Sequence, residues 1–231
     1  MTVRASIRAG TLVLALAWSV LPAGARGPLP TADEVVARHL AARGGVEAWK
    51  QVKSVRRIYE IGGMTIAGLW AGDRTRMDQF TDDQSEVSAT IGDTGWTQRP
   101  SDGQAARGLA GAEASDVRER AALGLELLLV RELKLKVAVA GEETLGRTTV
   151  IRVSIESPAG RRLSLLLDAK TWLEVARAHT ANGPDGAEQL TTEMGDYRPE
   201  GGILMPHQIG PGFVRYKINE PIDPGWFEKP R

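Results

Sequence analysis

Residues 55–80, VRRIYEIGGMTIAGLWAGDRTRMDQF, alternate in a period of two: Val55, Arg57 and Tyr59 face one side, and the residues between them face the other. Two turn signals, Gly62-Gly63 and Gly72-Asp73, divide the stretch into three short runs. Alternation bounded by glycine turns is typical of β-hairpins. Because no helix separates the runs, the pattern predicts an antiparallel meander rather than a parallel sheet.

The same rhythm continues on both sides of a single helical interruption, which predicts one α+β domain over residues 26–231. We expect strands at 55–61, 64–71, 75–80, 86–91, a short one around Trp96, 133–140, 148–156, 162–168, 172–180, 189–197, 204–209 and 213–218.

Two longer segments read as helices, and residues 46–52, with Trp49, read as a short helical turn. Thr31 and Glu34 form a capping box ahead of helically spaced apolar residues. A second helix is expected at 116–130, capped by Ser115 or Asp116, with residues 101–111 as a mobile loop before it. The leucines of residues 123–129 exceed one helical stripe, so we expect them to meet a second apolar surface, either a filled core or a bound ligand.

The N-terminus resembles an export signal. Arg4 and Arg8 precede an apolar run over residues 11–21, and Ala23-Gly24-Ala25 supplies small residues for cleavage. The alternative is an uncleaved anchor, but a membrane-spanning helix needs about 20 apolar residues. We therefore expect residues 1–25 to be a cleaved signal peptide and the mature protein to be periplasmic.

The composition excludes several classes. With 29 basic and 29 acidic residues the chain lacks the positive charge of a nucleic-acid binder, and with no cysteine it has no disulfide, thiolate site or lipidated cysteine. Its three histidines are far apart, and Asp82-Asp83 fits an ordinary turn. No catalytic motif is present. We expect no enzyme activity, no cofactor and no metal.

Several stretches resemble the periplasmic outer-membrane lipoprotein-sorting (LolA/LolB-like) family. They are the leucine-rich run GRRLSLLLDA at 160–169 with KTWL after it, GDYRPEGGILMP at 195–206, and the ending from Ile218 to Pro230. The resemblance covers roughly residues 32–231. It implies a strongly curved antiparallel sheet, an unclosed half-barrel, with helices covering its concave face and a lipidic ligand between sheet and helices. The basic residue that some carriers use near the cavity mouth has no clear counterpart, so hydrophobic-ligand binding is the safer expectation.

The candidate ligand-binding residues are apolar side chains on the early strands and the second helix. Tryptophan is the ambiguous type here, because Trp70 and Trp96 on neighbouring strands could line a cavity or fill the core. The full set is Met64, Ile66, Trp70, Met77, Trp96, Leu123, Leu127 and Leu128.

Two functions fit these features. The first is a carrier of a lipid or lipid-modified protein, loaded or unloaded by an envelope membrane complex. The second is an exported interaction or sensor module with a filled core, for which the loop at 101–111 and the proline-rich tail at 221–230 would form the contact surface. In both we expect a monomer that binds no nucleic acid.

Overall fold

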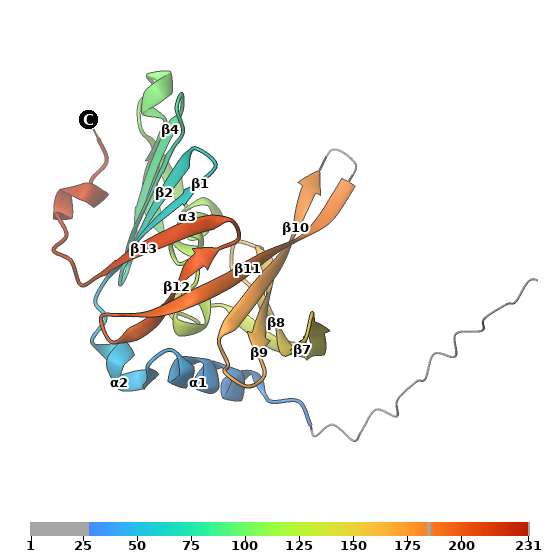
Figure 1. Ribbon diagram of the computed structural model, residues 1–231. Helices are drawn as coiled ribbons and strands as arrows, with labels where there is room; N and C mark the ends of the chain where they lie inside the picture. The colour runs from blue at the N-terminus through green and yellow to red at the C-terminus, as the bar shows by residue number, and fades with distance from the viewer. Residues whose placement is uncertain (1–27, 184–185, 231) are drawn as a thin grey trace, which may run out of the picture.

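The computed structural model describes residues 28–183 and 186–230, and the predicted signal peptide lies outside these ranges. The described chain is dominated by one antiparallel sheet of 13 strands (Figure 1). The strand order is β6-β5-β4-β3-β2-β1-β13-β12-β11-β10-β9-β8-β7, so the only neighbours distant in sequence are β1 and β13. The last strand thus joins an N-terminal meander to a C-terminal meander.

The predicted meander is confirmed. Strands β1, β2, β8 and β9 have the predicted bounds, and most others differ by one to three residues at an end. The exceptions are β6, which was not predicted, and β7, which ends five residues later than predicted. The strands are β1 Val55–Ile61, β2 Met64–Ala71, β3 Arg74–Phe80, β4 Ser85–Ile91, β5 Thr94–Gln98, β6 Arg107–Ala110, β7 Lys136–Leu145, β8 Thr148–Glu156, β9 Arg162–Asp168, β10 Glu174–Gly183, β11 Gly186–Glu200, β12 Ile203–Ile209 and β13 Gly212–Ile218.

The expected strong curvature is not what the structure shows. The sheet is large and open, with β6 and β7 as its two edges, and it is not strongly curled. Residues 101–111 also differ from expectation. They are not simply a loop, because η1 (Pro100–Asp102) is followed by β6, which pairs with β5.

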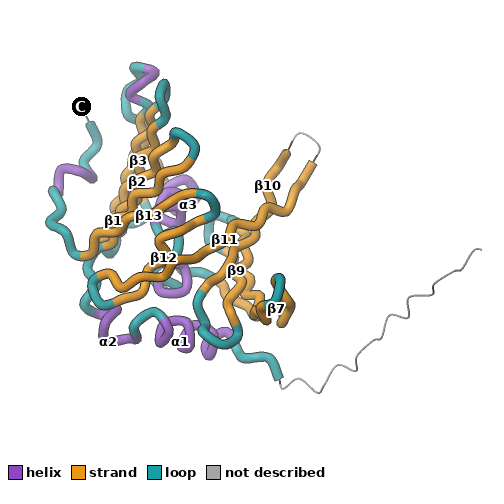
Figure 2. The backbone as a smooth tube through the Cα atoms, in the orientation of Figure 1, coloured by secondary structure: helices purple, strands orange, loops and turns teal. Residues whose placement is uncertain are grey.

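Helices make up little of the chain (Figure 2). The first, α1 (Ala32–Ala42), has the predicted capping box, in which Glu34 N donates to Thr31 Oγ1 and Thr31 N donates to the Glu34 carboxylate. A short α2 (Gly45–Lys50) follows. A 3-10 turn, η3 (Pro224–Phe227), lies in the C-terminal tail.

The prediction of one helix over 116–130 is wrong at both ends. Helix α3 spans Ala112–Ala121, with Gly111 rather than Ser115 or Asp116 at its N-cap. After Ala121 the chain makes turns, and only Glu126–Leu128 (η2) is helical, as a 3-10 turn. Gly124 has φ +82°, which is incompatible with continuing the helix. We call residues 122–135 the leucine segment.

The sheet has two differently covered faces. We define the inner face as the one that carries Val55, Arg57 and Tyr59 of β1, and it packs against α1, α3 and the leucine segment. The outer face carries Leu69, Ala89 and Trp96, and the C-terminal tail covers it through Ile222, Trp226 and Phe227.

Candidate functional site

The leucine segment fills the inner face. Its buried leucines are between 0% and 9% exposed and belong to the same apolar cluster as β1, β2, β8, β9 and β11–β13. They are Leu125, Leu127, Leu128, Leu129, Leu133 and Leu135, while Leu123 is partly buried against the same cluster. The second apolar surface that the sequence led us to expect for these leucines is therefore the protein's own core.

Buried arginines attach this segment to the sheet and to α1. Arg57 of β1 donates from Nη1 to the Leu123 carbonyl (2.9 Å) and from Nη2 to the Arg120 carbonyl (3.3 Å). Arg43, directly after α1, donates from Nη1 to the Gly124 carbonyl (3.1 Å). Both guanidinium groups are buried, at 3% and 1% residue exposure. A buried turn without helical hydrogen bonds needs donors for its carbonyls, and these side chains supply them.

A buried ion triad completes the attachment. Arg177 of β10 bonds Glu126 of η2 (Nη1–Oε1 2.9 Å) and Glu174 at the start of β10 (Nε–Oε1 2.8 Å). Glu126 also accepts from Gly124 N (2.8 Å). Burial opposes ionisation of Glu126, but Arg177 outweighs it and lowers the pKa of that carboxyl, whereas burial raises the pKa of Glu174. Such a triad is costly to break, because one partner left alone is an uncompensated buried charge.

The structure brings most of the predicted site residues together. Met64, Ile66, Trp70 and Met77 share the inner face of β2 and β3, and Trp70 is stacked on Trp49 of α2 with ring centroids 5.7 Å apart. Leu123, Leu127 and Leu128 of the leucine segment pack in one apolar cluster with Ile66 and Trp70, whereas Met77 belongs to a second cluster beneath α3.

Trp96 is separated from this group. The ladder pairs Trp70 with Thr75, Thr75 with Thr90 and Thr90 with Gly95, so Trp96 faces outward. There it packs against Phe227, and its Nε1 donates to the Phe227 carbonyl (2.9 Å). Trp70 and Trp96 therefore do not line one cavity.

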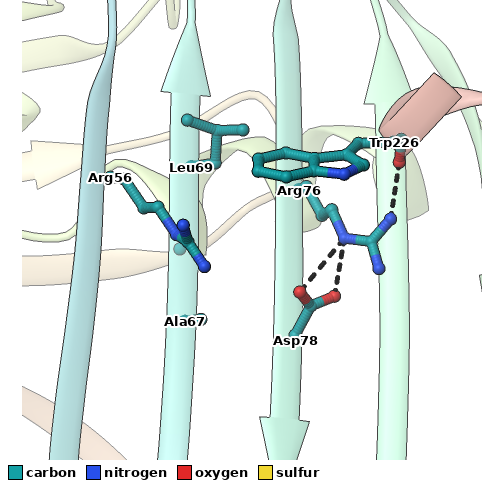
Figure 3. A pocket seen from close by; sticks show the side chains of 7 residues that line it. Arg56, Ala67, Leu69, Arg76, Asp78 and Trp226 are labelled. Carbon is teal, nitrogen blue, oxygen red and sulfur yellow. Dashed lines mark hydrogen bonds and ion pairs between the residues drawn. The ribbon is translucent and has the colours of Figure 1, made fainter. Parts of the chain in front are cut away.

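The pockets that the structure describes lie away from the eight predicted residues. A small one of about 80 Å³ opens on the outer face, where Trp226 of the tail lies over Arg56, Leu69 and Asp78 (Figure 3). Arg76 holds its wall by donating to Asp78 (2.8 Å) and to the Trp226 carbonyl (2.7 Å). Four further pockets of 260–380 Å³ lie elsewhere, and none of the five is lined by a predicted site residue. The inner face is therefore filled around the leucine segment, whereas one of these pockets opens on it beside α3, at Ser88 and Thr97.

Sequence reasoning missed the polar half of this site. Arg43, Glu126, Glu174 and Arg177 carried no motif, and Arg57 was placed on the same face as Val55 and Tyr59 without a role. The available signal was the alternation of side chains along β1, which places Arg57 on the buried face. A buried arginine needs hydrogen-bond partners there. Among the described residues, no cluster of three potential metal ligands exists, and no helix is long and apolar enough to cross a membrane.

Comparison with solved structures identifies the architecture. A LolA superfamily protein from Nitrosomonas europaea aligns over 87% of this chain and 99% of its own, with a TM-score of 0.53 at 11% identity. The chain has a LolA-like fold. A DUF1329 family protein from Desulfovibrio piger (TM-score 0.48, 10% identity, 85% and 97% covered) and a putative outer membrane lipoprotein-sorting protein domain from Vibrio parahaemolyticus (0.43, 12%, 81% and 89%) are more distant. No protein-family model and no curated protein matches the sequence. At such identities the LolA-like likeness concerns the fold alone.

Proposed function

We propose that this protein binds and carries a hydrophobic ligand, a lipid or the acyl chain of a lipid-modified protein, on the inner face of its sheet. The leucine segment would act as the cover that the ligand displaces. The observation that carries this proposal is the way the cover is attached. Side-chain hydrogen bonds from Arg43 and Arg57 hold its carbonyls, where a continuous helix would have held itself. Release of the segment requires the exchange of these side-chain contacts and of the buried Glu126–Arg177 ion pair.

The energetics favour a long-chain guest. The leucines are already shielded in the closed form, so a ligand has to replace the contacts that they lose. An acyl chain contributes about 0.8 kcal/mol per buried CH₂ group, so a chain of 12–16 carbons can offset the displacement of several leucines. The proposed location is the periplasm, and a membrane complex of the envelope would load or unload the cargo.

Two measurements test the proposal. Native mass spectrometry of protein purified under mild conditions should show retained lipid, and added tetradecanoate should quench tryptophan emission. The stacked pair Trp49–Trp70 on the inner face is the expected reporter. A Trp70→Phe variant should therefore lose most of the signal, while Trp96→Phe, on the outer face, should keep it. Uniformly ligand-free protein with no quenching would rule the carrier function out.

One observation favours the alternative of an interaction module. The leucines are packed against their own core, and only Leu133 among them lines any of the five described pockets. Under this alternative an affinity pull-down should retain one stoichiometric envelope protein and no lipid.

A further inference from the structure

Two neighbouring buried polar groups on the inner face have no hydrogen-bond partner in the described part of the chain. They are the Nε–H of Arg57 on β1 and the hydroxyl of Tyr216 on β13. The two residues are direct partners in the β1–β13 register, so their side chains leave the same face of adjacent strands. Almost all buried polar groups in folded proteins are hydrogen-bonded, so two open ones side by side indicate a place where something else binds.

Both groups are held in fixed positions by their surroundings. The Nη1 and Nη2 atoms of Arg57 are committed to the carbonyls of Leu123 and Arg120, which leaves Nε. Tyr216 packs edge-to-face against His207, with ring centroids 5.5 Å apart. Burial raises the pKa of Tyr216 to about 12, so at neutral pH its hydroxyl keeps the proton and can donate it. The pair therefore offers two donors and no negative charge.

A row of residues connects this pair to an open pocket. Successive strand pairings run from Tyr216 through Arg57, Gly68 and Met77 to Ser88 and Thr97. Ser88 and Thr97, joined by a hydroxyl hydrogen bond of 2.8 Å, line a pocket of about 380 Å³ beneath α3. Between the pocket and the pair this row carries Gly68 and Met77, and the Ala121 carbonyl at the end of α3 occupies the space over Gly68. Methionine is unbranched and adapts its shape easily.

We propose that Arg57 Nε–H and Tyr216 O–H bind the sp² oxygen of an amphiphile's head group, a carboxylate or an ester carbonyl, while its chain lies on the apolar inner face. This inference rests on the proposed carrier function and adds a selection rule to it. The ligand is an acyl compound with a hydrogen-bond acceptor in its head group. A plain hydrocarbon could make the apolar contacts but not the two hydrogen bonds.

The test compares three ligands of equal chain length: tetradecanoate, methyl tetradecanoate and tetradecane. Calorimetric titration of the full mature protein should show tighter binding of the first two. Tyr216→Phe should weaken their binding by about threefold to tenfold, as expected for one lost hydrogen bond, and leave tetradecane unchanged. A larger loss for the acid than for the ester assigns the site to a carboxylate, and equal losses assign it to a carbonyl. Because the hydroxyl is unbonded in the protein, this variant should keep its melting temperature.

Tyr59→Phe is the matched control. Tyr59 lies on the same face, but its hydroxyl already donates to the Ile209 carbonyl (3.1 Å). Its removal should lower stability and leave the ratio of tetradecanoate to tetradecane affinity unchanged. If Tyr216→Phe alters none of the three affinities, or all three equally, the head-group site is overturned and the carrier function stands. If wild-type protein binds none of the three, the carrier function fails, and the head-group site fails with it.

Discussion

Gly68 on the inner face of β2 has no side chain, and atoms of three other residues pack closely against its position. A Cβ there would lie 3.3 Å from the Ala121 carbonyl, from Arg57 Nη2 and from the Met77 sulfur. Gly68→Ala should therefore push the start of the leucine segment outward and lower the free energy of unfolding by about 1–3 kcal/mol. Urea denaturation measures this. Gly108→Ala, where a Cβ meets nothing within 4 Å, is the control and should change little.

A second prediction at the residue scale concerns His39. Burial lowers its pKa from 6.5 to about 3, and its Nδ1 lies 2.8 Å from the Trp172 carbonyl. Since the unfolded chain takes up the proton first, stability from His39 is complete above pH 6.5 and is lost as the pH falls toward 3. The slope should be up to about 1.4 kcal/mol per pH unit.

Denaturant titrations between pH 7 and 5 should show a flatter pH dependence for His39→Gln than for wild type. Val35→Ala, at a buried position of the same helix that carries no ionisable group, should lower stability and retain the wild-type slope. An unchanged slope in His39→Gln would contradict the assignment.

The period-two alternation of a strand predicts which face of the sheet a side chain takes, but not which groups it contacts there. The alternation of β1 places Arg57 on the core side from the sequence alone. Its partners, the carbonyls of Arg120 and Leu123, are more than 60 positions away, at the end of α3 and in the turn that follows it. The sequence therefore showed that Arg57 needs buried hydrogen-bond partners, but only the tertiary structure identifies them.

At the scale of elements, the arginine contacts should decide how firmly the leucine segment is held. Arg57→Met keeps a long apolar side chain and removes both donors. We expect faster amide exchange in residues 120–128 and, if the segment is the cover, faster uptake of tetradecanoate. Hydrogen exchange with mass spectrometry and stopped-flow fluorescence measure the two. Arg215→Met, which removes an exposed ion pair with Glu60 on the outer face, should change neither.

The elements also show which local signals suffice. Period-two alternation and glycine turns are local, so the strands were predicted nearly to their ends. Residues 122–130 of the leucine segment were predicted as helix because a cap signal at Ser115 or Asp116 precedes apolar residues at helical spacing, a pattern that favours a helix. The positive φ of Gly124 and the burial of Glu126 against Arg177 override that preference, and both depend on the rest of the molecule.

At the scale of the whole molecule, the sheet keeps two covered faces separate. Trp70 and Trp96, which could have lined one cavity or filled the core, lie on opposite faces because the register across each hairpin decides which face a side chain takes. The curvature of the sheet results from small twists between neighbouring strands, added over all 13 strands. No single sequence motif predicts it. Fold class was accessible from the sequence, whereas shape was not.

This separation predicts that stability and binding can be changed independently from the outer face. Truncating the chain after Glu220 removes Phe227, 3% exposed, and the acceptor of Trp96 Nε1. Removing a buried aromatic side chain alone costs about 3–5 kcal/mol, so the truncated protein should melt at a lower temperature. Its affinity for tetradecanoate should stay within about twofold of wild type at a temperature where it is folded, because the tail contributes nothing to the inner face. Phe227→Ala should show the same pattern at smaller amplitude. If the truncated protein folds but no longer binds tetradecanoate, binding depends on the outer face of the sheet. The inner face alone would then not be the binding site.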